Sequence, residues 1–352
     1  MENTQKNILV APLNWGLGHA TRCIPIIKKL ERNGFTPIIA SDGDSLALLK
    51  KEFPKLTALE LPSYHITYPK KGWLFRLKII QLLPKILKAI KAEKKLTKKW
   101  VIEYKLKGII SDNRYGVFNK KVPSVFITHQ LSVLSGNFTK TTSLFQKLNI
   151  QKFNECWVPD FETTPNLSGD LGHSHSISKP IRYIGPLSRF KKMALPVEYD
   201  LLVLLSGPEP QRGILEKKLK KELHRYAGKT LFIKGIIESK QKIEHLNNIT
   251  FYNFMTSSQL EKALNESALI LCRSGYSSIM DVTQLGKKAF FIPTPGQFEQ
   301  EYLAYKLKKE RVAPFANQSN FRIENLMEID FYKVSRESKT PTDWEALFKI
   351  FT

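Results

Sequence analysis

The sequence predicts an α/β protein made of two doubly wound, Rossmann-like domains that face one another. Short β-branched runs alternate with amphipathic helical stretches, which is typical of a parallel sheet covered by helices on both faces. The alternation restarts with the apolar run at residues 200–205, after a linker bounded by Pro186 and Pro196. The chain has 352 residues, more than the roughly 250–300 residues at which one hydrophobic core stops growing.

The first domain is expected to span residues 1–188. Its strands are predicted where short apolar runs end at a glycine, a proline or a polar residue, namely at 7–12, 36–40, 108–111, 124–128, 156–159 and 182–185. A helix is predicted at 21–33, and Gly34 is expected to end it because glycine is favoured just past a helix C-terminus.

The second domain is expected to span residues 189–330. Its strands are predicted at 200–205, 230–234, 249–252, 268–272 and 289–293. Its helices are predicted at 213–226, 258–264, 276–285 and 299–309. Residues 331–352 are too few for a third domain, and we expect them to pack as a C-terminal helix.

The composition favours a polyanionic partner. The formal net charge is +23 at pH 7, and residues 70–107 hold 13 Lys and Arg against only Glu93 and Glu103. The three cysteines form no CxxC pair and no disulfide framework, which predicts a reducing cytoplasm. No basic start precedes a long apolar run, and no stretch of about 18 apolar residues occurs, so we expect neither a signal peptide nor a spanning helix.

The loop after the first predicted strand carries the first candidate site residues, Gly16, Gly18 and His19. Ligands of open α/β sheets bind at the carboxyl ends of the strands, and two glycines allow the backbone to approach a ligand closely. The third glycine is missing and no acidic residue closes the predicted strand at 36–40, which argues against a dinucleotide site. His19 could accept a proton from a hydroxyl near neutral pH. The alternative is a histidine that caps the helix.

Asp112 follows the strand at 108–111, which a doubly wound sheet would place beside the first strand. We therefore expect Asp112 next to His19, where a carboxylate would hold the imidazole and stabilise its protonated form. The alternative is that Asp112 caps a turn. His129, at the end of the next strand, is a second candidate at the same edge.

In the second domain, Arg273, Ser274 and Gly275 join a strand to a helix, and free N–H groups at a helix start favour an anion. Asp281 lies seven residues after Ser274 and therefore on the same helix face, about 10 Å along the axis. This separation suits a diphosphate at the helix start and a ribose diol beyond it. The alternative is an ordinary capped helix with one exposed aspartate.

Three further segments could complete a nucleotide-sugar site. Gln300 and Glu301, at another helix start, could bind sugar hydroxyls. Backbone groups of residues 253–255 could pair with the edge of a base, and the loop at 206–207 could face a phosphate.

Taken together, these motifs resemble the GT-B glycosyltransferases, especially the MurG-like, family 28 group and its relatives with a Gly-His-Ala-Thr-Arg start. The resemblance covers essentially the full length. It implies a GT-B fold with two facing Rossmann-like domains and a C-terminal helix. The His19–Asp112 pairing is also similar to the histidine–aspartate dyad of plant-type UDP-glycosyltransferases, which invert the anomeric centre.

The resemblance also implies a role for each residue of the donor site. The base would lie against Phe254 and Met255, and the diphosphate would lie against Ser274 and Gly275. The remaining implied donor residues are Ser206, Gly207 and Arg273 near the phosphates, Asp281 at the ribose in place of the usual Glu, and Gln300 and Glu301 at the sugar. Glu301 replaces a glutamine, and Pro208 and Pro210 replace a glycine-rich turn, so the chain departs from the peptidoglycan enzyme itself.

The expected reaction moves a sugar, N-acetylglucosamine or another hexose, from a UDP-sugar to an acceptor hydroxyl, with inversion and without a metal ion or other cofactor. Helix N-termini with Arg273 or Arg212 would neutralise the leaving phosphate. The Asp-Gly-Asp run at 42–44 and the two histidines of 172–175 are interpreted as loops.

The basic segment at 73–107 interleaves lysines with leucines and isoleucines at helical spacing. A basic amphipathic helix can lie on an anionic membrane, which would suit a lipid-linked or envelope glycan acceptor. We therefore expect a cytoplasmic protein that is peripheral on the inner face of the cytoplasmic membrane. The alternative is a domain helix with a solvated lysine face.

Two other functions are consistent with parts of the sequence. A UDP-sugar 2-epimerase would share the fold but would need more carboxylates around the sugar. A non-enzymatic nucleic-acid-binding protein would explain the charge. Nucleic acid is disfavoured because the charge is concentrated on one helical stretch and no stacking motif of the RRM type occurs.

Overall fold

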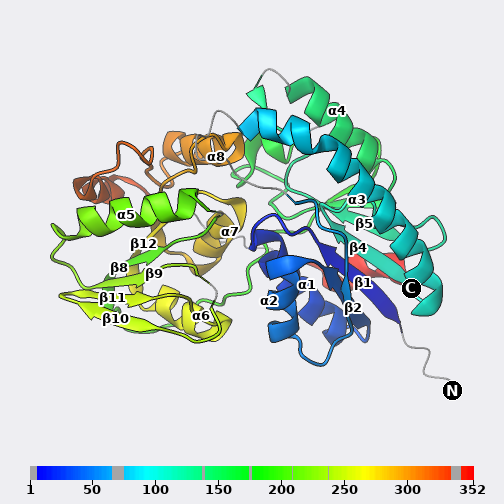
Figure 1. Cartoon of the computed structure of the whole chain (residues 1–352), viewed down its shortest axis with the longest axis horizontal. Coiled ribbons are helices and arrows are strands. Elements are labelled where there is room, and N and C mark those ends of the chain that lie inside the picture. The colour runs from blue at the N-terminus through cyan, green and yellow to red at the C-terminus, as the bar shows by residue number, and fades with distance from the viewer. Residues whose placement is uncertain are drawn as a thin grey trace. The chain divides into compact units, whose positions relative to one another are not determined.

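The computed structural model describes residues 6–65, 75–136, 139–173, 177–207, 209–236, 238–333 and 342–352, with the backbone alone at 75–81. The chain divides into two compact units (Figure 1). The first unit contains the described residues of Met1–Ile66, Ile79–Leu187 and Ser338–Thr352, and the second contains those of Thr67–Lys78 and Ser188–Glu337.

The first unit is built on a seven-stranded parallel sheet in the order β3-β2-β1-β4-β5-β6-β7. The strands are β1 (Asn7–Pro12), β2 (Thr36–Ser41), β3 (Ala58–Glu60), β4 (Gly108–Asp112), β5 (Ser124–Ile127), β6 (Glu155–Val158) and β7 (Ile181–Tyr183). The chain runs outward from β1 to β3 and then returns to β4 on the other side of β1. The strand order therefore reverses between β1 and β4, and ligands of open α/β sheets bind at the carboxyl ends of such a pair.

Helices cover both faces of this sheet (Figure 1). They are α1 (Gly18–Arg32), α2 (Gly43–Glu52), α3 (Phe75–Glu103), α4 (Thr139–Ile150) and the 3₁₀ turn η3 (Gly169–Leu171). On one face, Leu9, Ile38 and Ile109 from neighbouring strands pack with Trp100 of α3. Each such buried apolar side chain stabilises the fold by about 1.5–3 kcal/mol.

The C-terminal residues belong to the first unit and not to the second. Helix α9 (Trp344–Phe348) and the 3₁₀ turn η5 (Lys349–Phe351) place Phe348 against Phe35, with ring centroids 5.8 Å apart. The Phe351 ring lies so close to Gly108 that a Cβ atom there would come within 2.2 Å of it. A C-terminal helix was expected, and its packing explains why β4 begins with a glycine.

The second unit has a six-stranded sheet in the order β10-β11-β9-β8-β12-β13, parallel except for the pair β10–β11. Its strands are β8 (Tyr199–Leu204), β9 (Thr230–Ile233), β10 (Ile243–Leu246), β11 (Ile249–Tyr252), β12 (Ser267–Cys272) and β13 (Lys288–Phe291). The helices are α5 (Gln211–Leu223), α6 (Ser257–Asn265), α7 (Tyr276–Leu285), α8 (Phe298–Lys309) and the 3₁₀ helix η4 (Ile323–Phe331). Here the strand order reverses between β8 and β12.

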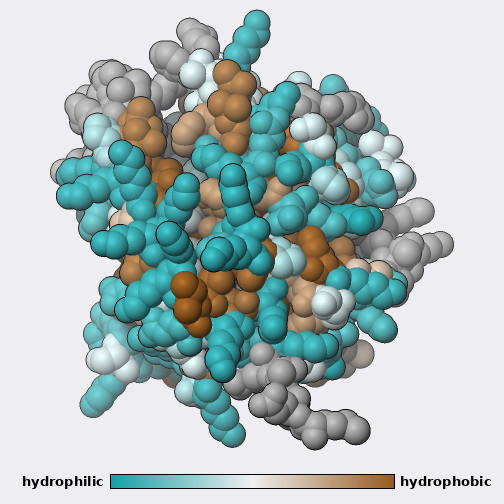
Figure 2. Space-filling view, turned by 90° about the vertical axis from the view of Figure 1, so that its right-hand side faces the viewer, coloured by the Kyte–Doolittle hydropathy of each residue, from teal (hydrophilic) through white to brown (hydrophobic). Residues whose placement is uncertain are grey.

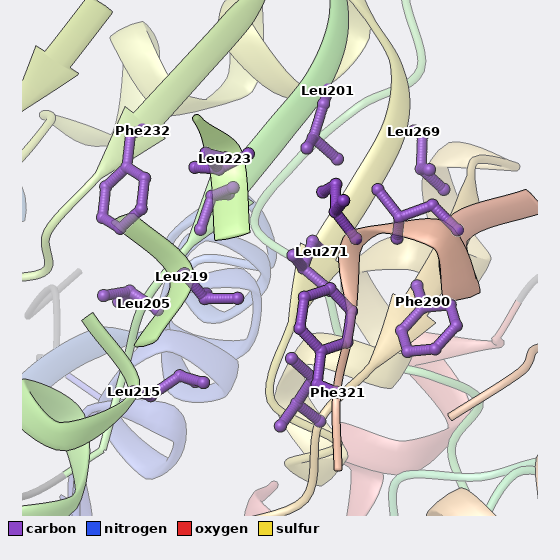
Figure 3. Packing of buried hydrophobic residues seen from close by; sticks show 14 of the residues in the cluster. Leu201, Leu205, Leu215, Leu219, Leu223, Phe232, Leu269, Leu271, Phe290 and Phe321 are labelled. Carbon is purple, nitrogen blue, oxygen red and sulfur yellow. The ribbon is translucent and has the colours of Figure 1, made fainter. Parts of the chain in front are cut away.

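One face of this second sheet packs on α5 and on the segment that includes η4 (Figure 3). Leu215, Leu219 and Leu223 recur every four residues along α5 and therefore form one stripe that meets the strands. The rings of Phe290 and Phe321 pack edge to face, with centroids 5.6 Å apart.

The predicted fold class is confirmed, because both units are helix-covered, mainly parallel sheets. The strands β3 and β10 and the helices α2 and α4 were not predicted. All four residues of β10 are exposed, and its sequence, Ile-Glu-His-Leu, shows neither the continuous apolar run of a buried strand nor the strict alternation of a half-buried one.

Candidate active site

The carboxyl ends of β1 and β4 lie side by side at the point of strand reversal in the first unit. Pro12 is in register with Asp112, and the N–H of Leu13 donates to the carbonyl oxygen of Asp112 over 2.9 Å. The loop at 13–17 follows, and α1 begins at Gly18 without a side-chain cap. His19 is thus the second residue of a helix that starts directly above Asp112.

The structure brings His19 and Asp112 together as the strand order requires. Nδ1 of His19 lies 2.8 Å from Oδ1 of Asp112. The Asp112 side chain is fully buried, whereas the His19 side chain is 14% exposed. No described residue bonds to Nε2 of His19, so that nitrogen is the one available to a ligand.

Arg22 also binds this carboxylate, and sequence reasoning missed it. Its Nε donates to Oδ2 of Asp112 over 2.5 Å, and its Nη2 bonds to Oδ1. Nη2 is also 2.8 Å from Nδ1 of His19, and Nη1 is 3.1 Å from Nδ1 of His129. The available signal was its spacing, since residues three apart on a helix lie on one face.

Burial and neighbouring charges shift the pKa values of these groups in different directions. Burial favours a neutral Asp112, but the Arg22 guanidinium and the His19 imidazole outweigh it and hold the pKa of Asp112 well below its ordinary value. The pKa of His19 is lowered, first by burial and also by Arg22 and His129, against the opposing effect of Asp112. His19 is therefore neutral near pH 7 and can accept a proton.

Gly16 and the buried side chain of Arg114 also lie at this edge of the first sheet. Gly16 has φ +77°, a conformation that favours glycine, and a Cβ atom there would meet nothing within 4 Å. The side chain of Arg114 is fully buried, forms an ion pair with Asp42 and another with Glu93 at 2.9 Å, and donates to the carbonyl oxygen of Pro12. Asp42, of the Asp-Gly-Asp run, thus belongs to a buried network under the site.

In the second unit, α7 begins after Gly275 without a side-chain cap, and Gly275, Ser277 and Ser278 are partly exposed. The first amides of a helix have no partner within it, so this end can bind an anion. The side chain of Ser274 differs from the expectation, because it is buried and its Oγ donates to the carbonyl oxygen of Gln300 over 2.8 Å. The helix start and not the Ser274 hydroxyl therefore faces solvent.

The expected phosphate-neutralising arginines are both committed to other contacts. Arg273 is only 2% exposed and donates to Gln318 Oε1 over 2.7 Å and to the carbonyl oxygens of Gln211, Ile292 and Pro293. Burial lowers its pKa to about 10. Arg212 forms ion pairs with Glu209 and Glu216. The structure thus gives both side chains other partners, and their contact with a donor phosphate stays a prediction.

Asp281 lies on α7 and is partly buried. Its Oδ1 accepts a hydrogen bond of 2.6 Å from Oγ of Ser188, a partner that sequence reasoning missed. Burial raises the pKa of Asp281 to about 6, while the Ser188 bond and the charge of Arg189 act in the opposite direction.

The side chains of Gln300 and Glu301 lie beside different parts of the second unit. A Cβ atom on Gly275 would lie 4.0 Å from Nε2 of Gln300, so this amide is beside the start of α7. Oε1 of Glu301 accepts the N–H of Gly296 over 2.9 Å, and Glu301 lines a separate hollow of about 700 Å³. The other lining residues are Ile214, Lys218, Pro293, Pro295, Phe315, Asn317, Gln318 and Ser319.

The backbone of Phe254 is already paired, which corrects the expectation that it meets the base edge. Its N–H donates to Oδ1 of Asn253 over 3.0 Å, and its carbonyl accepts from Nε2 of Gln241 over 2.7 Å. Met255 is partly exposed and remains the candidate of this segment. The exposed residues Ser206 and Gly207 follow β8, and Gly207 has φ +96° in open space. Pro208 lies outside the described residues.

Comparison with known proteins shows what the sheet edge of the second unit is similar to. Residues 213–341 match the glycosyltransferase family 28 C-terminal domain, and this range includes β12, the start of α7 and α8. The second unit is therefore similar to the C-terminal domain of family 28 glycosyltransferases.

The chain is 26% identical over 168 residues to a protein of Haemophilus ducreyi named UDP-N-acetylglucosamine–N-acetylmuramyl-(pentapeptide) pyrophosphoryl-undecaprenol N-acetylglucosamine transferase. The match covers 44% of this chain and 46% of that relative, so it spans about half the length of both.

Solved structures show the same fold over nearly the whole chain. The glycotransferase of kitacinnamycin has a TM-score of 0.64 at 14% identity and covers 92% of this chain and 89% of its own. The MurG of Acinetobacter baumannii has a TM-score of 0.55 at 15% identity, with 93% and 92% covered. The GT-B fold is thereby confirmed.

Helix α3 carries most of the predicted basic segment at 73–107. Residues 104–107 follow the helix, and residues 73 and 74 lie outside the described ranges. One face of the molecule shows small hydrophobic areas between hydrophilic side chains (Figure 2). None of the described helices is long and apolar enough to cross a membrane.

No three His, Cys, Asp or Glu side chains within the described ranges gather as metal ligands. The two ring nitrogens of His173 each lie 3.0 Å from a backbone carbonyl oxygen, which fits the predicted loop, and residue 175 is outside those ranges.

Proposed function

We propose that this glycosyltransferase moves a sugar, N-acetylglucosamine or another hexose, from a UDP-sugar to an acceptor hydroxyl with inversion at the anomeric carbon. The observation that carries the proposal is the His19–Asp112 pair at the strand reversal of the first sheet. Asp112 bonds to Nδ1, which leaves Nε2 to a ligand. The name of the Haemophilus relative supports the choice of a UDP-linked donor.

The proposed reaction needs one proton transfer. The acceptor oxygen forms a bond to the anomeric carbon while the bond from that carbon to the diphosphate oxygen breaks. Nε2 of His19 takes the hydroxyl proton, and the negative charge leaves with UDP. Asp112 stabilises the imidazolium that forms because its carboxylate faces Nδ1.

We propose that backbone groups and not a metal ion receive the diphosphate. The start of α7 supplies amides without a side-chain cap, and a helix N-terminus carries about half a unit of positive charge. The exposed loop of Ser206 and Gly207 follows the adjacent strand and can contribute further N–H groups. Asp281 then accepts from the ribose hydroxyls, and Met255 lies against the base.

A lipid-linked acceptor and an anionic membrane surface complete the proposal. Leu83 and Leu87 of α3 are 45% and 43% exposed, and Leu144 and Leu148 of α4 are 55% and 52% exposed. The inner side of α3 packs Ala89 in the core, so these leucines lie on the outside of the same unit. The same helix α3 also carries exposed lysines, at positions 85, 88, 91, 94, 95, 98 and 99.

A donor and acceptor screen tests the function directly. The full chain is incubated with UDP-linked and other nucleotide sugars, with and without membrane lipids as acceptors, and UDP release is compared with labelled sugar in the lipid fraction. Sugar transferred from a UDP donor supports the proposal. An isomerised UDP-sugar without transfer contradicts it and favours the epimerase, and binding of DNA without binding of UDP contradicts both enzymes.

A further inference from the structure

The side chain of Arg22 lies at the centre of the charged groups below the proposed base. It is 3% exposed, and its guanidinium bonds to both oxygens of Asp112. The same group lies within hydrogen-bond distance of Nδ1 of His19 and Nδ1 of His129, at 2.8 and 3.1 Å. The thiol of Cys23 also faces Asp112, at 3.7 Å.

Charge counting shows what this arrangement does to a proton on His19. Among the groups that face one another here, Asp112 supplies one negative charge and Arg22 supplies one permanent positive charge, because a guanidinium does not lose its proton in proteins. Burial raises the pKa of the Cys23 thiol, as does Asp112, so the thiol adds no charge. Protonation of His19 would place a second positive charge beside Arg22, and both cations would then share the single carboxylate of Asp112.

A histidine paired with a buried carboxylate alone would hold a proton tightly and would already be charged at neutral pH. An imidazolium cannot accept the proton of an acceptor hydroxyl. His19 therefore needs the carboxylate of Asp112 to orient its ring, but it must stay unprotonated until the acceptor hydroxyl gives up its proton.

We propose that Arg22 is a positioning residue that holds Asp112 in place for His19 and keeps His19 unprotonated until the transfer step. The inference rests on the proposed role of His19 as the base. Arginine suits the task because its planar fork reaches both carboxylate oxygens at once, whereas a lysine ammonium acts as a single point charge.

The inference is tested by titrating His19 in the full chain without any substrate. The histidines are labelled with ¹³C and ¹⁵N, the His19 signals are assigned by their loss in H19Q, and the pKa of His19 is measured in the wild type, R22Q and R22K. We expect the pKa to rise by about one unit or more in R22Q and by less in R22K, which keeps the charge. An unchanged or lower pKa in R22Q would overturn the inference.

R22Q leaves a buried carboxylate without its main partner and can fail to fold. The pair D112N and R22Q/D112N then measures the same effect without that carboxylate. We expect the pKa of His19 to be higher in the double variant than in D112N, because only the double variant has lost the neighbouring cation. Equal values in the two variants would overturn the inference.

The ¹⁵N shifts of the neutral wild-type protein distinguish this inference from the function on which it rests. A proton on Nδ1 that faces Asp112 leaves Nε2 free to act as the base. A proton on Nε2 would contradict the base role itself, whatever the variants do. In active protein, R22Q is also expected to move the acidic limb of the kcat/KM profile to higher pH, and a drop in kcat alone with an unmoved limb would show a merely structural role.

Discussion

Each unit carries its candidate site where the strand order of its sheet reverses, but the two sites consist of different chemical groups. In the first unit, buried arginines meet carboxylates: Arg22 binds Asp112, and Arg114 binds Asp42 and Glu93. In the second unit, the buried Arg273 meets only neutral oxygens, and the exposed surface at the strand reversal consists of a helix start and a glycine loop.

The difference fits the two tasks that we propose for these sites. Proton transfer needs titratable side chains whose pKa values are set by fixed neighbours, and the first unit supplies them in a buried network. Binding a diphosphate needs N–H groups aimed at oxygen, and a backbone supplies these without any ionisable group. The comparison therefore predicts that variants of the first site change pH profiles and turnover, whereas those of the second change donor affinity or folding.

The largest effect is expected from H19Q, which removes the proton acceptor. We expect kcat to fall by about 10²–10⁴-fold, because that is the usual contribution of a general base. UDP affinity, measured by calorimetry, should stay near the wild-type value because the donor residues lie in the other unit. H129Q is the matched control, since His129 contacts Arg22 but not Asp112 in any bond described, and its effect on kcat should be much smaller. Equal losses of kcat in H19Q and H129Q would contradict the specific role of His19 as the proton acceptor.

The second-largest effect is expected on the stability of the second unit, and it compares Arg273 with Arg212. R273Q removes donors from buried carbonyl oxygens, each of which costs about 1–3 kcal/mol when left unpaired, so we expect a loss of about 3 kcal/mol or more in local stability. R212Q is the control, with a loss near 1 kcal/mol, because Glu209 is 60% exposed and Glu216 keeps its ion pair with Lys220.

Hydrogen exchange of the β12 and β13 amides measures this stability within the second unit. Unchanged exchange in R273Q, together with weakened UDP binding, would mean that Arg273 reaches the donor and does not hold the strand ends together.

The sequence predicted the parts of both sites that depend on local signals and on strand order. Asp112 was placed next to His19 because a doubly wound sheet puts the fourth strand beside the first. The roles that tertiary packing decides were not predicted. Nothing in the local sequence shows that Arg22 turns toward a strand 90 residues away, or that Arg273 and Ser274 turn inward.

Contacts decided by tertiary packing were also not predicted for the linker between the two predicted domains. Ser188 is the last residue of the predicted first domain, but it lies in the second unit, where its bond to Asp281 joins residues 93 positions apart. A serine in a polar linker carries no signal for such a partner, whereas the aspartate on α7 was found from its helical spacing to Ser274.

The smallest effect is a pH dependence of donor binding through Asp281. Its folded pKa of about 6 lies above the ordinary value for an aspartate, because burial disfavours the charged form. The ionised carboxylate therefore opposes folding above pH 6, and this cost disappears as the pH falls toward 4. Binding has the opposite sign, since only the ionised form accepts from both ribose hydroxyls.

We expect the affinity for UDP to fall several-fold as the pH drops from 7 to 5, with the midpoint near 6, and D281N to show no such step. S188A sharpens the test. The Ser188 hydroxyl stabilises the ionised carboxylate, so its removal raises the pKa of Asp281 and moves the step to higher pH. A step that persists unchanged in D281N would assign the pH dependence to another group, the UDP phosphate itself, and would leave Asp281 outside the donor site.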